Sequence, residues 1–135
     1  MLDDGLTEWL GGLLARHGAV AGTVHLIHDD HLALAAAVNI PPKVAELTAK
    51  IPFGKGMAGL AWQRDKPVQT CNLQDDASGD VQPGAKAVDA RAAIALPVHR
   101  AAAIRAIVGL AWLDDRVLSD EIVAAIAGDA ASLPG

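Results

Sequence analysis

The sequence predicts a single α+β domain in which helices lie on the faces of a mostly antiparallel β-sheet. Four apolar, β-rich segments occur as two consecutive hairpins, and consecutive hairpins build antiparallel sheets. Segments whose apolar residues recur at helical spacing lie at both ends of the chain, outside the hairpins. A chain of 135 residues fits one domain, residues 1–135, whose core needs neither a disulfide nor a metal.

The first predicted elements are a helix and a hairpin. The helix spans residues 6–16, and Gly18 follows it as a stop signal. Its apolar residues at helical spacing are Leu6, Trp9, Leu10, Leu13 and Leu14. The next two segments, Gly22–His28 and His31–Val38, are β-rich, and Asp29-Asp30 between them supplies a turn. These two strands are therefore expected to pair as a hairpin.

The centre of the chain alternates short helices with breaks. Pro41-Pro42 interrupts the sheet, because proline cannot donate a ladder hydrogen bond. The pattern is then helical over Lys43–Lys50 and, after a glycine-rich turn, again over Met57–Asp65. A short strand is expected over Pro67–Cys71.

A long polar segment precedes the second hairpin. Residues 72–91 are rich in Asp, Ser, Gly, Gln and Pro, and a loop this long in a compact domain is usually functional. The strands Ala92–His99 and Ile104–Leu113 follow it as the second hairpin. Ser119 is expected to cap a final helix over residues 120–132.

Composition and charge exclude several classes of partner. The formal net charge is −5 and the basic residues are scattered, which argues against a nucleic-acid partner. No apolar run approaches the roughly 18–20 residues that span a bilayer, and residues 1–18 are not a signal peptide, so no membrane partner is expected. The single cysteine suits a reducing compartment. We expect a cytoplasmic protein with no cofactor.

Four motifs in the centre of the chain resemble those of the GAF domain family. They are Ile51–Ala61 with its Gly-x-Gly-x-x-Gly turn, Lys66-Pro67-Val68, Ile94–Val98 and Ile107–Ala111. Their order and spacing fit the family over about residues 20–113. The resemblance implies a stand-alone GAF-like (PAS-like) domain, with a central, mostly antiparallel sheet and flanking N- and C-terminal helices. It also implies a small-molecule-binding or sensory function.

The glycine turn invites a second interpretation. The string Gly54-Lys55-Gly56-Met57-Ala58-Gly59 satisfies the dinucleotide-binding pattern, and Asp75 lies about 20 residues onward. That motif needs a strand directly before its first glycine, and the sequence predicts none there. We therefore interpret the first two glycines as a tight turn, and we expect the third to pack closely on the sheet.

The candidate ligand site is the polar segment from Cys71 to Lys86, which begins where a strand ends. In a GAF fold this loop closes the ligand cavity, with Lys55 entering from the glycine turn. The candidate ligand-binding residues are Lys55, Met57, Cys71, Asn72, Gln74, Asp75, Asp76, Ser78 and Lys86. Carboxylates, lysines and amides together suit a small polar ligand. The alternative is a solvated loop with local Asx turns.

Cys71 and the histidines carry further hypotheses. A lone cysteine is most often a small buried hydrophobe, but a lysine or a histidine nearby would make it reactive. One branch of the GAF family, the free methionine-(R)-sulfoxide reductases, uses loop cysteines and a second, resolving cysteine, which this sequence lacks. The histidines His25, His28 and His31 cluster around the first hairpin, where solvated or partly buried side chains are a simpler explanation than metal or haem ligands.

Three functions follow from these observations. The leading hypothesis is a ligand-binding or sensory module that forms a homodimer through its terminal helices, residues 6–16 and 120–132. The second is a small redox enzyme that uses Cys71 with an aspartate of the loop as acid–base partner. The third is a ligand-free scaffold for dimerisation.

Overall fold

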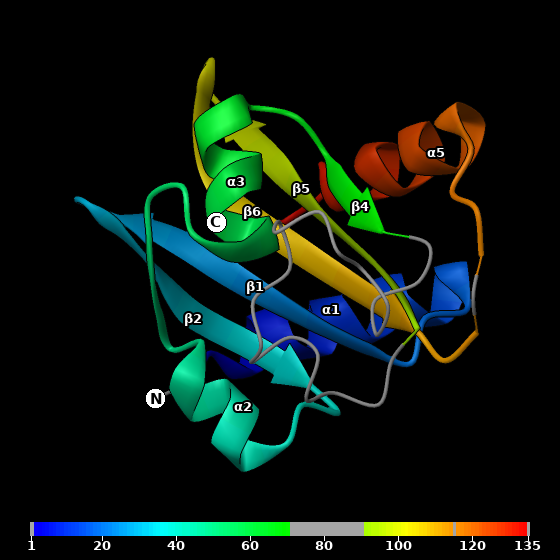
Figure 1. Ribbon diagram of the computed structural model, residues 1–135, viewed down its shortest axis with the longest axis horizontal. Helices are drawn as coiled ribbons and strands as arrows, with labels where there is room; N and C mark the ends of the chain where they lie inside the picture. Colours follow the sequence, from blue (N-terminus) through cyan, green and yellow to red (C-terminus); the bar gives the residue numbers. More distant parts are fainter. Residues whose placement is uncertain (1, 71–90, 115, 135) are drawn as a thin grey trace.

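Figure 1 shows a computed structural model of the protein, which describes residues 2–70, 91–114 and 116–134. Its strands are β1 (Ala21–His28), β2 (His31–Val38), β3 (Lys50–Pro52), β4 (Val68–Thr70), β5 (Ala92–Arg100) and β6 (Ala103–Trp112). Its helices are α1 (Asp4–His17), α2 (Pro42–Leu47), α3 (Gly56–Arg64) and α5 (Asp120–Ala130). The six strands form one sheet in the order β3-β2-β1-β6-β5-β4, and every pairing is antiparallel. The predicted α+β class is confirmed.

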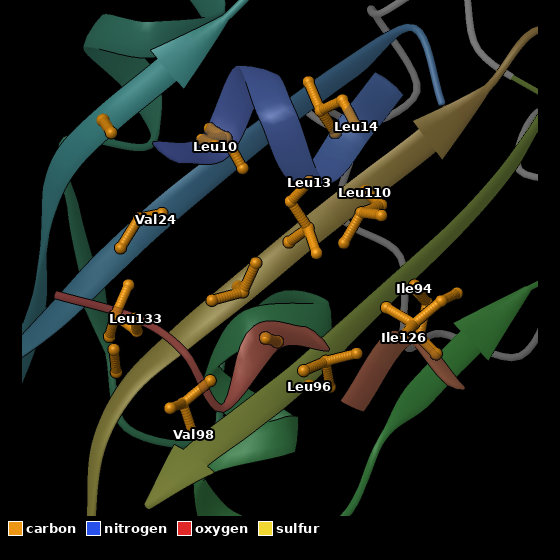
Figure 2. Close-up of a cluster of buried hydrophobic side chains, with 14 of the residues drawn as sticks. Leu10, Leu13, Leu14, Val24, Ile94, Leu96, Val98, Leu110, Ile126 and Leu133 are labelled. Atoms are coloured by element: carbon orange, nitrogen blue, oxygen red, sulfur yellow. The ribbon is translucent and has the colours of Figure 1, made fainter. Parts of the chain in front are cut away.

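The main core lies between one face of the sheet and the two terminal helices (Figure 2). Alternation along the strands sends every second side chain to this face. Its fully buried members include Leu10 and Leu13 of α1, Val24 of β1, Leu110 of β6 and Ile126 of α5. With few aromatic side chains in the chain, close contact between helix and sheet supplies most of the packing.

Helix α1 begins and ends as its capping residues dictate. The Asp3 carboxylate accepts a hydrogen bond from the Leu6 N–H at 2.9 Å, which satisfies one of the free donors of the first turn. At the other end Gly18 adopts a left-handed conformation with φ 65°, and the Ala19 N–H returns to the Leu14 carbonyl. The predicted stop signal at Gly18 is confirmed.

Polar contacts join α1 to the C-terminal end of α5. The Asp129 carboxylate lies 2.7 Å from His17 Nε2, and the Trp9 indole N–H donates to the Ser132 hydroxyl at 3.0 Å. The Trp112 indole N–H donates to the His17 carbonyl, which ties α1 to the sheet. The apolar faces of both helices thus pack against their own sheet. That packing counts against the expected dimer through these helices, which stays a prediction.

One element departs from the expectation. The predicted helix Lys43–Lys50 ends at Leu47, and Lys50–Pro52 forms the edge strand β3, which pairs with β2. The Leu34 N–H of β2 donates to the Ala49 carbonyl, so the chain is already hydrogen-bonded to β2 one residue before β3 begins. Tertiary pairing here overrides a weak helical pattern. In the described part of the chain, no helix has the length and hydropathy to cross a membrane.

Candidate functional site

The second face of the sheet, opposite α1 and α5, is here called the α3-side face. Helix α3 covers part of it, with Ala61 packed on Leu32 of β2, Val68 of β4 and Ile107 of β6. In Figure 1, α3 lies across the near side of the sheet and α1 behind it. Residues directly opposite each other on neighbouring strands point to the same face, so the strand register identifies the rest of this surface.

Small residues cover the α3-side face next to the area under α3. Thr23, Gly109 and Ala95 lie opposite one another on β1, β6 and β5, and Ala111 and Ala93 form the next row. We call these five residues the small-residue floor. A Cβ atom placed on Gly109 would lie 2.9 Å from the Thr23 Oγ1, so the backbone is closely approached there. All of them except Ala95 are partly exposed.

His25 borders the small-residue floor and is buried. It pairs with Ile107, which places its side chain on the α3-side face, and only 2% of it is exposed. Its Nε2 lies 2.8 Å from the Thr48 carbonyl, and because a carbonyl only accepts, Nε2 carries the hydrogen and Nδ1 the lone pair. Nδ1 is buried, with no hydrogen-bond partner among the described residues.

Burial decides the charge state of His25. Desolvation lowers the pKa of its imidazole below the ordinary value of 6.5, and the hydrogen bond to the Thr48 carbonyl opposes that shift only in part. The side chain is therefore neutral at pH 7. The α3-side face thus presents a neutral, buried acceptor beside a floor of small side chains.

The glycine motif forms a tight turn, as predicted. Gly54 and Gly56 have φ angles of 78° and 64°, and the Gly54 N–H donates to the Gly59 carbonyl at 3.1 Å. A Cβ atom on Gly59 would lie 2.8 Å from the Pro52 carbonyl oxygen, so this glycine packs on the turn itself. The expectation that no strand precedes the turn was wrong, because β3 lies directly before it. Among the described residues every strand pairing is antiparallel, so the glycine turn is not part of the parallel βαβ unit that a dinucleotide site requires.

Two of the nine predicted ligand-binding residues fall in the described part of the chain. Lys55 is exposed at the start of α3, where its carbonyl accepts the Gly59 N–H. Met57 is partly buried and packs in the apolar cluster between α3 and the sheet. The others lie outside the described residues: Cys71, Asn72, Gln74, Asp75, Asp76, Ser78 and Lys86.

The hairpin histidines separate into two environments. The rings of His28 and His31 meet edge to face at 5.3 Å, and His31 Nδ1 lies 3.0 Å from the Asp30 carboxylate. The expectation of solvated or partly buried side chains holds for these two and is wrong for His25. Within residues 2–70, 91–114 and 116–134, no three potential metal ligands gather. The signal that the sequence offered for His25 was its alternation with Val24, which points to the opposite face.

Comparisons with known proteins agree with this architecture. The family model for the GAF domain matches residues 4–132. A type II free methionine-R-sulfoxide reductase from Thermoplasma acidophilum superimposes with a TM-score of 0.77 at 15% identity, covering 96% of this chain and 89% of that one. The GAF domain of a phosphoenolpyruvate-protein phosphotransferase from Coxiella burnetii gives 0.73 at 18% identity, covering 93% and 80%.

A third solved structure has a similar fold. The free methionine-R-sulfoxide reductase from Neisseria meningitidis, solved with its substrate, gives a TM-score of 0.67 at 20% identity, covering 94% of this chain and 75% of that one. Comparison with curated proteins gave no significant match. At these identities the solved structures establish the fold alone. The family match spans nearly the whole sequence, and the chain therefore belongs to the GAF domain family.

Proposed function

We propose that this GAF domain is a sensory module that binds a small polar molecule over the small-residue floor. The observation that carries the proposal is the floor itself. Across three central strands, five positions hold only Thr, Ala or Gly, four of them partly exposed. Large apolar side chains at these positions would bury more surface and stabilise the sheet, so small ones leave room for another molecule.

The composition of the neighbouring segment supports a polar ligand. Residues 72–90 lie between β4 and β5, the strand next to it in the sheet, and contain Asp75, Asp76 and Lys86. We propose that this segment closes the site. Its carboxylates and lysine would then bind the polar groups of the ligand, while the floor contacts its apolar part.

A thermal-shift screen tests the proposed function. The probes are the free amino acids, cyclic nucleotides and methionine-R-sulfoxide. A compound present at about 100 times its Kd stabilises the native state by about 2.7 kcal/mol through mass action. The variants Asp76→Ala and Lys86→Ala should each reduce the shift, whereas Gly128→Ala on the exposed side of α5 should leave it unchanged. A screen without any hit would favour a ligand-free scaffold, and a hit unaffected by both variants would exclude the segment.

A redox enzyme is the second candidate, because the similar solved structures include free methionine-R-sulfoxide reductases. In this chemistry the sulfoxide oxygen passes to a cysteine thiolate, which takes up one proton and becomes a sulfenic acid, while the substrate leaves as the thioether. Two electrons from a second thiol must then reduce the sulfenic acid. The sequence holds only Cys71, so the second thiol would have to be an external one.

Two measurements separate the enzyme from the sensor. The first follows loss of free methionine-R-sulfoxide with dithiothreitol as the external thiol, with Cys71→Ser as the control. The second follows alkylation of Cys71 against pH, since a catalytic thiol needs a lowered pKa. Turnover that disappears in Cys71→Ser would establish the enzyme. A thiol that reacts as slowly as an ordinary buried cysteine, without turnover, would exclude it.

We further propose, as a separate point, that the domain forms a homodimer through the parts of its terminal helices that do not pack on its own sheet. Exposed apolar side chains near the start of α5, Val117 and Ile122, would lie at such an interface. Size-exclusion chromatography with light scattering measures the mass directly. A monomer at the highest soluble concentration would refute the dimer and leave the ligand site untouched.

A further inference from the structure

We propose that His25 Nδ1 is a recognition point for the ligand and accepts a hydrogen bond from an uncharged N–H or O–H group. The inference rests on the proposed function, because it assigns the polar contact at the edge of the small-residue floor. It commits to one class of ligand, in which an amide, a lactam or a hydroxyl faces His25.

The hydrogen bonding of the imidazole leaves one ring nitrogen open. Nε2 donates to the Thr48 carbonyl at 2.8 Å, which fixes the tautomer and leaves a lone pair on Nδ1. Buried acceptors in native proteins almost always have a partner, yet Nδ1 has none among the described residues. A donor supplied by the ligand would satisfy it.

The position of the ring brings it to the edge of the floor. His25 lies opposite Ile107 on β6 and Leu34 on β2, one row along β1 from Thr23 of the floor. His25 is only 2% exposed, so a molecule over the floor reaches Nδ1 only after the atoms that cover the ring move aside. The bond to the Thr48 carbonyl, from a residue 23 positions away in the sequence, also holds the ring in place. A fixed acceptor gives more specificity than a mobile one.

The surroundings of His25 select an uncharged donor. The floor residues and the strand neighbours Leu34 and Ile107 carry no charge. A cationic group placed there would lose its hydration without gaining a counter-charge from them. A neutral N–H or O–H group loses less on burial, and one hydrogen bond to Nδ1 compensates for it.

The test uses two amides that differ in one donor. N-methylacetamide carries an N–H group, and N,N-dimethylacetamide replaces it with a methyl group. With ¹⁵N-labelled histidine, N-methylacetamide should move the Nδ1 resonance of His25 upfield in a saturable way, and N,N-dimethylacetamide should leave it in place. Equal responses to both amides, or no response of Nδ1 to either, would overturn the inference.

Two variants separate the two nitrogens. Glutamine can place its amide near the position of Nε2, and asparagine near that of Nδ1. His25→Gln should therefore keep the bond to Thr48 and lose binding of N-methylacetamide, whereas His25→Asn should lose stability and keep part of the binding. Binding that survives in His25→Gln as strongly as in the wild type would refute the assignment.

The outcome also distinguishes this inference from the proposed function. If N-methylacetamide moves backbone resonances of Thr23 and Gly109 but not Nδ1, the floor binds ligands and the role of His25 is wrong. If neither amide reaches the floor, the role of His25 is likewise refuted, and the thermal-shift screen alone decides the proposed function.

Discussion

Replacing Gly22 with alanine tests the close contact between α1 and the sheet. A Cβ atom at this position would lie 2.7 Å from the Gly109 carbonyl oxygen and 2.8 Å from a methyl group of Leu14. The first neighbour is backbone of the central strand β6, so relief requires β1 to shift relative to β6 and the Leu14 side chain to move as well. Overpacking of this kind costs about 1–3 kcal/mol. Gly22→Ala should lower the free energy of unfolding by that amount.

Two other glycines provide matched controls for the same chemical change. At Gly11 in α1 and Gly128 in α5, an added Cβ atom would meet nothing within 4 Å, and alanine is favoured over glycine inside a helix. Gly11→Ala and Gly128→Ala should each raise stability by roughly 0.5–1 kcal/mol. Urea unfolding followed by tryptophan fluorescence measures all three. Gly22→Ala with wild-type stability and an unchanged m-value would refute the packing argument.

Three further predictions concern the site and the helix contacts. Because burial lowers the pKa of His25 below 6.5, the unfolded chain binds a proton that the folded chain does not. The contribution of neutral His25 to the free energy of unfolding is therefore complete above about pH 6.5 and is lost as the pH falls below that value. Urea midpoints measured across this range should fall more steeply with decreasing pH in the wild type than in His25→Gln. Asp129→Ala should cost about 1 kcal/mol by calorimetry, because the partly buried His17 loses its carboxylate partner, and an unchanged Tm would contradict this. Gly109→Ala should weaken the binding of any ligand found in the screen, because the added methyl group would lie 2.9 Å from the Thr23 hydroxyl and would force the floor to change shape. An unchanged affinity would mean that the ligand binds elsewhere.

Much of the fold follows from local patterns in the sequence. The strand His31–Val38 has the predicted bounds, and the terminal helices differ from prediction by one or two residues at their ends. These elements are long and strongly patterned, and the predicted cap Ser119 marks the start of α5, where its hydroxyl accepts the Ile122 N–H. The three-residue strand β3 is too short to show a period of its own, and Pro52 is unusual in strands, so only its pairing with β2 reveals it.

The candidate site shows where sequence patterns stop. Alternation along β1 indicates that His25 points away from the face that holds Val24, but not what shelters it there. The Thr48 carbonyl, 23 residues away in the sequence, bonds to its Nε2, and that is a tertiary contact that no local pattern shows. The small-residue floor likewise exists only through register, because Thr23, Ala95 and Gly109 lie far apart in the sequence. The role of Asp75, Asp76 and Lys86 stays a prediction.

The order of the strands also has a consequence for how copies of this chain can meet. The two outermost strands, β3 and β4, are only three residues long, and an unpaired edge is where proteins polymerise by adding strands. Strand β2 extends past β3, and there its Ala35 carbonyl already accepts a hydrogen bond from the Asp3 N–H. Proline also removes a backbone N–H donor near each edge. On one edge this residue is Pro52 of β3, and on the other it is Pro97 of β5, which lies beyond the first residue of β4. These features disfavour growth of the sheet from one molecule into the next, and so reduce the tendency of a chain rich in Ala, Val, Leu and Ile to aggregate through its strands.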